Sequence, residues 1–227
     1  MDPDALYRDV HTDYFETQKK DLWFYERLWA VLLRQLEKRT RGRCLVEFGS
    51  GPGFLLKLAG RMDWLAKGIE PSLIARRHAA NLGVLSSPSL GPCEEFDAAI
   101  ATEVLEHIEC QEAALEEWRS ALVAGGYLAI SVPNDNNPLQ RLFWGKKKPW
   151  LHHTHKSYFN PRSLRELVES CGFKVVWQRT SFPVELLLVL PIPRKWAWKL
   201  SRLWPAPPLL WRFHIGRHCL LVAQKTS

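Results

Sequence analysis

The chain is 227 residues long, enough for one α/β domain with added segments and an ample apolar core. Its 46% hydrophobic and 24% charged residues are ordinary for a globular protein. Five single cysteines without a CxxC pair suit a reducing compartment and offer no metal-site spacing. The acidic first residues are unlike a signal peptide, and the best apolar run, Leu186–Leu190, is too short to span a bilayer. We therefore expect a cytoplasmic protein.

Basic residues gather in two windows without acidic residues, 136–165 and 186–227, which also hold six of the eleven tryptophans. The formal net charge of the whole chain is +7. Two interpretations of the windows remain open. Their tryptophans pack inward as a lid while the bases are solvated, or the windows lie together on an anionic membrane. The stretch Trp196–Trp204 mixes rings and charges in a way that suits a helix on lipid.

The first forty residues are predicted to contain a long helix. Apolar side chains recur at intervals of three and four between Trp23 and Leu36, which gives a helix a single apolar stripe. We expect this helix to pack over the edge of the sheet that follows rather than to form a separate module.

A glycine-rich turn follows the first predicted strand, Leu45–Phe48. Gly49, Gly51 and Gly53 stand at alternate positions, and a helix is expected from Phe54. Glycine accepts positive φ and lets a ligand approach the backbone closely, because it has no Cβ. Strand, glycine turn and helix form the nucleotide end of a doubly wound α/β sheet. The GxGxG spacing differs from the GxGxxG of dinucleotide sites, and the turn holds no GKS or GKT, which argues against NAD and against a P-loop.

The second predicted strand ends in an acidic residue, Glu70, about 20 residues after the glycines. A carboxylate at this place can accept hydrogen bonds from both hydroxyls of a ribose. The alternative is a solvated glutamate on the surface. Ser72 is expected to cap the next helix, Leu73–Asn81, and Val84–Leu85 is expected to form a short third strand.

The fourth predicted strand, Phe96–Thr102, runs directly into Glu103 and the sequence VLEHI. Glu103 and His107 are four residues apart, so they share one face if this turn is helical. Such a pair is usually a surface contact, but its place at the carboxyl end of a central strand favours a position in a site.

The remaining elements alternate between helix and strand. A helix is expected to stop before Gly125 and Gly126, and Asn160 and Pro161 begin another that ends before Gly172. In chain order the expected segments are a helix 112–123, a strand 127–134, an insertion 135–159, a helix 161–171, a strand 173–177 and a last strand 218–223.

Taken together, these segments resemble the class I S-adenosylmethionine (SAM)-dependent methyltransferases. The glycine turn is similar to their first motif. The run FD-x-x-I followed by EVLEHI resembles the segment after strand four in the quinone-biosynthesis and related small-molecule methyltransferases, and GG-x-L-x-I-S-V-P-N is also similar. The resemblance implies a doubly wound, seven-stranded, mostly parallel sheet of order 3-2-1-4-5-7-6, with strand seven antiparallel. An N-terminal helix and a helical, tryptophan-rich insertion before the last strand complete this Rossmann-like fold.

The resemblance also implies SAM as the cofactor and one domain over residues 1–227. Residues 1–40 are then a helical lead-in, 43–133 the cofactor-binding half, and 134–227 the acceptor half with its insertions. In related enzymes the lead-in closes over the site, a role that Tyr14 and Phe15 can take here. The candidate cofactor-binding residues are Glu47, Gly49, Ser50, Gly51, Gly53, Glu70, Pro71, Thr102, Glu103 and His107. No residue beyond strand three stands out as a ligand of the adenine.

Methyl transfer from a sulfonium needs no metal, but a hydroxyl acceptor must lose its proton. His152, His153 and His155 are the candidate general bases, because a histidine of near-neutral pKa suits this work. A zinc site is the competing interpretation of these histidines. The insertion supplies no cysteine or carboxylate at a matching spacing, so no metal is expected.

We therefore expect a methyltransferase acting on a small-molecule or lipid-like acceptor, at oxygen, with peripheral contact to the inner face of a membrane under the lipid interpretation. One alternative is a non-catalytic adaptor that keeps the SAM fold, against which the intact glycine turn and Glu70 argue. Another is a nucleic-acid methyltransferase, suggested by the basic charge. The sequence VPN after strand five differs from the NPPY-type motif of enzymes that methylate base amino groups, so nucleic acid is not the expected partner.

Overall fold

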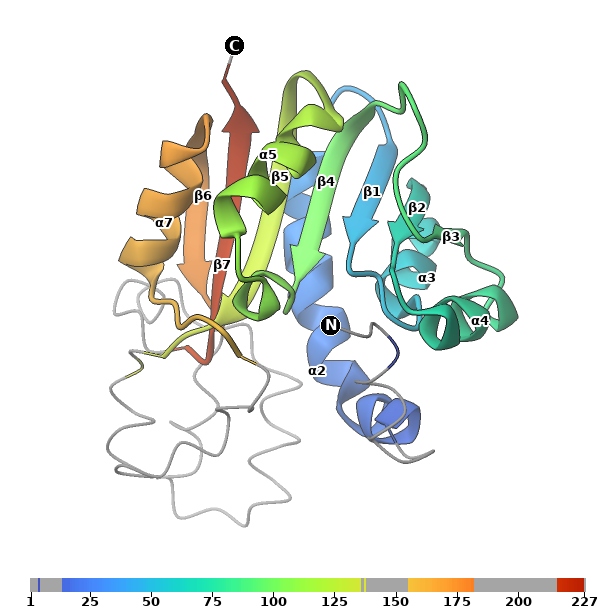
Figure 1. Cartoon of the computed structure of the whole chain (residues 1–227). Coiled ribbons are helices and arrows are strands. Elements are labelled where there is room, and N and C mark those ends of the chain that lie inside the picture. The colour runs from blue at the N-terminus through green and yellow to red at the C-terminus, as the bar shows by residue number, and fades with distance from the viewer. Residues whose placement is uncertain (1–3, 5–13, 136, 138–154, 182–215, 227) are drawn as a thin grey trace, which may run out of the picture.

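The computed structural model describes residues 4, 14–135, 137, 155–181 and 216–226, and side chains only from residue 22 onward within the first helix (Figure 1). The elements in chain order are α2 (Tyr14–Glu37), β1 (Cys44–Phe48), α3 (Phe54–Arg61), β2 (Leu65–Ile69), α4 (Leu73–Asn81), β3 (Ser86–Ser87), β4 (Phe96–Thr102), the 3₁₀ turn η1 (Leu105–His107), α5 (Gln111–Ser120), β5 (Leu122–Pro133), α7 (Pro161–Ser170), β6 (Phe173–Thr180) and β7 (His218–Lys225).

The seven strands form one sheet in the order β3-β2-β1-β4-β5-β7-β6. Strands β1 to β5 pair in parallel, and β7 runs antiparallel to both β5 and β6. The predicted fold class and strand order are therefore confirmed. Because the parallel strands point the same way, their carboxyl ends meet at one edge of the sheet (Figure 1).

Helices cover both faces of the sheet. In Figure 1, α5 and α7 lie in front of the strands, and α2 lies behind them. Neighbouring side chains of β1 point to opposite faces, so Leu45 joins the core beneath α2 and α3, while Val46 and Phe48 join the core beneath α5 and α7. On that second face Phe48 stacks on Trp118 of α5 with ring centroids 5.4 Å apart. Burial on both faces explains why the central strands read as continuous apolar runs.

Helix α2 confirms the predicted N-terminal helix. Its apolar stripe supplies Leu28, Leu32, Leu33 and Leu36 to the core, each at most 5% exposed. The helix packs against β5, β7 and α3, so it covers the middle of one face rather than the edge of the sheet. Among the described residues, no helix combines the length and apolar character needed to cross a membrane.

Several predicted boundaries differ from the structure. The third strand and the end of α5 differ because strand pairing overrides local sequence signals. The third strand is Ser86–Ser87, which pairs with Gly68 and Ile69, whereas Leu85 is 63% exposed. Helix α5 ends at Ser120 rather than at residue 123, because Leu122 already pairs with Phe96 of β4. The glycines expected to stop that helix therefore lie inside β5.

Candidate active site

The site is built where the carboxyl ends of β1, β2, β4 and β5 meet (Figure 1). In a doubly wound sheet this edge is where ligands bind. The glycine turn follows β1, Glu70 follows β2, Thr102 ends β4 and Asn134 follows β5. The fold therefore brings the separate sequence candidates of the cofactor half to one edge.

The glycine turn needs glycine for two reasons. Gly49, Gly51 and Gly53 have φ values of +67°, +47° and +85°, the left-handed region that side chains disfavour. In addition, a Cβ on Gly49 would lie 2.4 Å from a methyl of Val104, because the segment after β4 packs directly on the turn. The turn thus presents bare backbone at the start of α3.

Glu70 is buried and fastens the turn to the start of α4. Its Oε2 accepts a hydrogen bond from the Gly51 amide and its Oε1 accepts one from the Ser72 amide, both at 2.8 Å. With 5% of its surface exposed, it is not a solvated surface residue, so that alternative is wrong. Burial raises the pKa of Glu70 above its usual value, although the two amide bonds act the other way. Each oxygen keeps a second lone pair, which is where a ribose hydroxyl can donate.

The neighbours of Glu70 hold this corner in place. Ser72 caps α4 as predicted, since its Oγ accepts from the Ala75 amide, and it also donates to Asp4 at 2.6 Å. Asp4 itself therefore lies on the cofactor side. Pro71 is exposed, and its carbonyl accepts a hydrogen bond from Arg76.

Two other cofactor candidates lie beneath the turn. Ser50 is 5% exposed, and its Oγ is 3.0 Å from the Oγ of Ser86, so its side chain ties the turn to β3. Glu47 of β1 is 3% exposed, and its Oε2 has no hydrogen-bond partner among the described residues. Burial, together with the nearby charge of Glu70, raises the pKa of Glu47 well above its usual value.

Glu103 leaves β4 in a strained conformation and turns toward β5 and β7. Its φ is +55°, uncommon for a residue with a side chain and costing on the order of 1–3 kcal/mol. Its carboxylate accepts from the Ser131 hydroxyl at 2.9 Å and lies 3.4 Å from Nε2 of His218. Burial acts to raise the pKa of Glu103, but His218, Ser131 and His107 together lower it below its usual range.

His218 is a site residue that the sequence interpretation missed. Its ring contacts Phe24 and Tyr25 of α2, and its Nδ1 is buried with no hydrogen-bond partner among the described residues. His218 opens β7, and because β7 is antiparallel its first residue lies at the edge where the parallel strands end. The predicted strand order, with strand seven antiparallel, was therefore sufficient to place the first residue of that strand at the ligand edge.

Glu103 and His107 do not share a helix face, because the turn between them is not α-helical. Only residues 105–107 form a turn, and it is 3₁₀ rather than α-helical. Glu103 therefore lies with Ser131 and His218, whereas His107 lies with Glu106 and His155. The left-handed backbone at Glu103 makes its side chain point in a different direction from that of His107.

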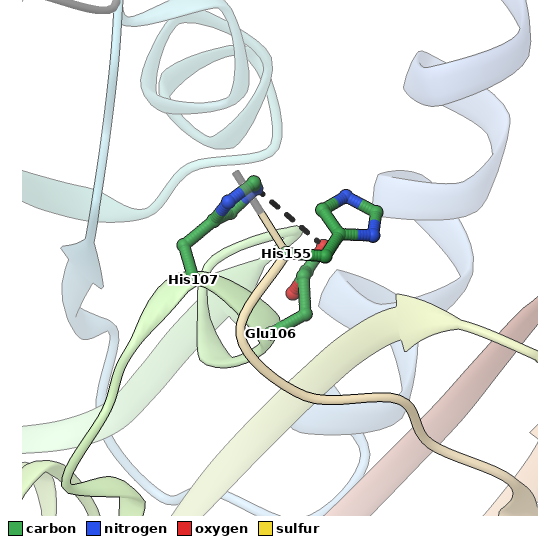
Figure 2. Close-up of side chains that lie close together, drawn as sticks. All are labelled: Glu106, His107 and His155. Atoms are coloured by element: carbon green, nitrogen blue, oxygen red, sulfur yellow. Dashed lines mark ion pairs between the residues drawn. The ribbon is translucent and has the colours of Figure 1, made fainter. Parts of the chain in front are cut away.

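Glu106, His107 and His155 form what we call the Glu-His-His cluster (Figure 2). Nε2 of His107 lies 3.9 Å from Oε1 of Glu106, and the two histidine rings stand edge to face with centroids 4.9 Å apart. Glu106 is 1% exposed, and burial with the nearby Glu103 raises its pKa well above the usual value. Of the three histidines predicted as bases, His155 thus lies in the site, and His152 and His153 lie outside the described residues.

The segment that carries His155 is fixed to the turn by its backbone. The amides of Lys156 and Ser157 donate to the carbonyl of Glu106 at 2.7 and 3.2 Å. Phe159 forms a parallel bridge with Asn134, next to the end of β5. The position of His155 is therefore set by the sheet, although the residues just before it are not described.

This geometry fits a nucleoside cofactor on one side and a proton-handling site on the other. The open backbone of the turn and the free lone pairs of Glu70 suit a ribose. The Glu-His-His cluster and the Glu103–His218 pair lie at the ends of β4, β5 and β7. Such a site is typical of doubly wound, cofactor-dependent transferases.

Comparison with known proteins agrees with this class. The family model of the methyltransferase domain matches residues 21–178. A ubiquinone biosynthesis O-methyltransferase of Paramagnetospirillum magneticum is 35% identical over 138 residues, which cover 55% of this chain and 54% of that protein. The enzyme of the same description from Shewanella halifaxensis is 25% identical over 146 residues, 56% of this chain and 62% of that protein. The chain thus spans only a little over half the length of these relatives.

A solved SAM-dependent methyltransferase of Archaeoglobus fulgidus has the same fold, with a TM-score of 0.66 and 18% sequence identity over 93% of this chain and 99% of its own. The chain belongs to the methyltransferase-domain family, whose model covers the glycine turn, Glu70 and the Glu-His-His cluster. The predicted family, fold and cofactor, SAM, are therefore confirmed.

Proposed function

We propose that this protein transfers the methyl group of SAM to an oxygen atom of a small-molecule or lipid-like acceptor. The observation that carries the proposal is the position of His155, which lies with His107 and Glu106 at the ends of β4 and β5, beyond the cofactor corner. The names of the two relatives, both O-methyltransferases, support oxygen as the accepting atom.

The cofactor corner supplies the residues that would hold SAM. Backbone groups of Gly49–Gly53 would lie against the cofactor, Glu70 would accept from the ribose, and Thr102 and Glu103 would line the end of β4 beside it. Bound SAM supplies a methyl group made electrophilic by its sulfonium, so the protein contributes mainly alignment of the acceptor.

The acceptor hydroxyl loses its proton to one of His152, His153 and His155, the residues predicted from the sequence, of which His155 lies in the described site. SAM bound at the cofactor corner would supply the methyl group to the acceptor oxygen, and S-adenosylhomocysteine would be the leaving product. Neutral imidazole near pH 7 is suited to accept such a proton.

Two alternatives compete with this proposal. A non-catalytic adaptor would need neither the strained Glu103 nor a histidine pair next to a buried carboxylate, and strain of this kind is typical of functional sites. A nucleic-acid methyltransferase is suggested by the charge of +7, but the relatives named above are described as O-methyltransferases of ubiquinone biosynthesis.

The proposal is tested with labelled SAM and a panel of acceptors. The protein should bind SAM and S-adenosylhomocysteine at one site by calorimetry. It should then methylate phenols, with and without a long apolar tail, and leave RNA and DNA unlabelled. SAM binding without transfer to any acceptor would favour the adaptor, and labelled nucleic acid would favour the other alternative.

A lipid-like acceptor would also explain the two basic, tryptophan-bearing windows. Most of their length, residues 138–154 and 182–215, lies outside the described residues, so this part of the proposal rests on the sequence. We expect co-sedimentation with anionic liposomes that fades as salt rises and weakens in the double variant Trp196→Ala, Trp198→Ala. Absence of liposome binding at low salt would leave the interpretation of the windows as an inward-packed lid.

A further inference from the structure

The Glu-His-His cluster has the composition of a metal site. One carboxylate oxygen of Glu106 and one ring nitrogen each of His107 and His155 lie within 4.8 Å of one another. Figure 2 shows the three side chains converging from two separate segments of the chain. Two imidazoles and a carboxylate with open positions left over form a common set of ligands for catalytic divalent metals.

The carboxylate of Glu106 is the second observation that indicates a ligand. Glu106 is 1% exposed, and both of its oxygens are buried with no hydrogen-bond partner in another described residue. The nearest ring nitrogen, Nε2 of His107, is 3.9 Å away, too far for a hydrogen bond. Burying a carboxylate without partners is costly, so natural proteins pair it or give it a metal.

The three residues are also held in place by the backbone. Two amides of the segment after His155 donate to the carbonyl of Glu106, so the segments that carry the ligands cannot separate independently. His107 follows Glu106 directly within η1. Ligands fixed in this way lose little conformational freedom on binding, which is a requirement of a functional metal site.

We propose that Glu106, His107 and His155 bind a divalent transition-metal cation of the Zn²⁺ or Mn²⁺ kind at the acceptor end of the site. Metal–ligand bonds in such sites are about 2.0–2.2 Å long, so the three atoms draw together on binding. Imidazole ligands favour Zn²⁺ over Mg²⁺, and the carboxylate also suits Mn²⁺. The sequence interpretation expected no metal because it sought carboxylates within the insertion, whereas the fold brings Glu106 from the end of β4.

The role of the cation rests on the proposed function. Three protein ligands leave positions for an oxygen of the acceptor, which ionises more readily when it is bound to a cation. His155 is then a ligand of the metal, and the hydroxyl proton leaves to His152, His153 or solvent water. Metal binding itself does not depend on the identity of the acceptor.

The first test measures metal binding without any substrate. The full chain is purified, stripped with a chelator and titrated by calorimetry with Zn²⁺, Mn²⁺ and Mg²⁺, and Co²⁺ is followed by its visible absorption. We expect one Zn²⁺ per chain and weaker binding of Mg²⁺. Since loss of an outer-shell partner lowers metal affinity about 10–100-fold, loss of a direct ligand in Glu106→Gln or His155→Ala should lower it by at least about 100-fold.

The matched control is Glu109→Gln, which removes an exposed carboxylate three residues from Glu106 and should bind Zn²⁺ like the unaltered protein. If Glu106→Gln fails to fold by circular dichroism, His107→Ala takes its place. Failure of the unaltered protein to bind Zn²⁺, Mn²⁺ or Co²⁺, or unchanged affinity in the folded ligand variants, would overturn the proposal.

The second test separates the metal site from the proposed function. The chelator should abolish methyl transfer, and added Zn²⁺ or Mn²⁺ should restore it, while SAM affinity changes by less than about twofold. Methyl transfer that is insensitive to the chelator would overturn the role of the cation and leave His155 as the base. Failure to bind SAM at all would overturn the proposed function and leave the metal titration as the test of the site.

Discussion

The cofactor corner and the acceptor side of this site differ in how their polar groups are satisfied. On the cofactor corner, Glu70 accepts two backbone amides, and Ser72 caps a helix. On the acceptor side, both oxygens of Glu106 and Nδ1 of His218 are buried without a hydrogen-bond partner in another described residue. The cofactor corner is therefore complete as folded, whereas the acceptor side contains groups whose partners we expect to arrive with a ligand.

This difference predicts different responses to mutation. A change on the cofactor corner breaks internal hydrogen bonds and should affect stability together with SAM affinity. A change at Glu106, whose carboxylate accepts no hydrogen bond from another described residue, should affect turnover while stability changes little.

The largest effect is expected for His155→Ala. Removing a group that handles the acceptor proton, directly or through a bound cation, should lower turnover by about 10²–10⁴-fold and leave SAM affinity nearly unchanged. Steady-state kinetics and calorimetry measure the two quantities. Lys156→Ala is the matched control, since it keeps the backbone amide that donates to Glu106 and loses only a partly exposed ion pair with Glu109. Normal turnover of His155→Ala would show that methyl transfer needs neither a general base nor a metal ligand at position 155.

The next effect is expected for Glu70→Ala. Loss of a charge-assisted hydrogen bond to the ribose should weaken SAM binding by about 1.5–3 kcal/mol, or roughly 10–150-fold in Kd. The melting temperature should fall as well, because the amides of Gly51 and Ser72 lose their acceptors. Glu112→Ala removes an exposed carboxylate of α5 and serves as the control. A lower melting temperature with unchanged SAM affinity would assign Glu70 a purely structural role.

A pair of glycine variants separates backbone strain from ligand contact. Gly51 and Gly83 have φ values of +47° and +74°, and a Cβ on Gly83 would meet nothing within 4 Å. Alanine in the left-handed region costs about 1–2 kcal/mol at either position. Both variants should therefore lose this backbone term in thermal unfolding, but only Gly51→Ala should also lose SAM affinity. Equal SAM binding by both variants would show that the cofactor does not bind against the turn.

The same contrast explains what the sequence predicted well. The glycine turn, the cap at Ser72 and the acid at Glu70 depend on chemistry within a few residues of the chain, so spacing and residue type were sufficient. The end of α5 and the position of β3 depend on which residues the neighbouring strands pair with. Leu122 and Ser86 take their places from those partners, which no local pattern specifies.

The acceptor side was harder to predict because its residues come together only in three dimensions. Glu106 and His155 meet through backbone hydrogen bonds between distant segments, and a 3₁₀ turn after a left-handed Glu103 sets the direction of His107. A shared face of Glu103 and His107 required an α-helical turn, which the structure does not have here. His218 differs from these residues, since the antiparallel β7 of the predicted strand order already placed its first residue at the ligand edge.

Glu47 is the exception on the cofactor corner, because its Oε2 is buried without a partner among the described residues. Burial, and then the charge of Glu70, raise its pKa in the folded protein. The folded state thus binds a proton more tightly than the unfolded state, whose pKa is about 4.3. Between the two pKa values, stability falls as pH rises, and above the folded value Glu47 destabilises the protein by a constant amount.

Glu47→Gln should remove this pH-dependent penalty. Without SAM, the variant should melt above the unaltered protein at pH 8, by about 2–4 °C for each kcal/mol gained, and the difference should shrink as pH falls toward about 4.3. Glu95→Gln, an exposed change, should show no such trend. If Glu47→Gln is instead less stable at pH 8, the carboxylate has a partner in the folded protein that an amide cannot replace. The buried groups of the cofactor corner would then all be satisfied, and its difference from the acceptor side would be larger.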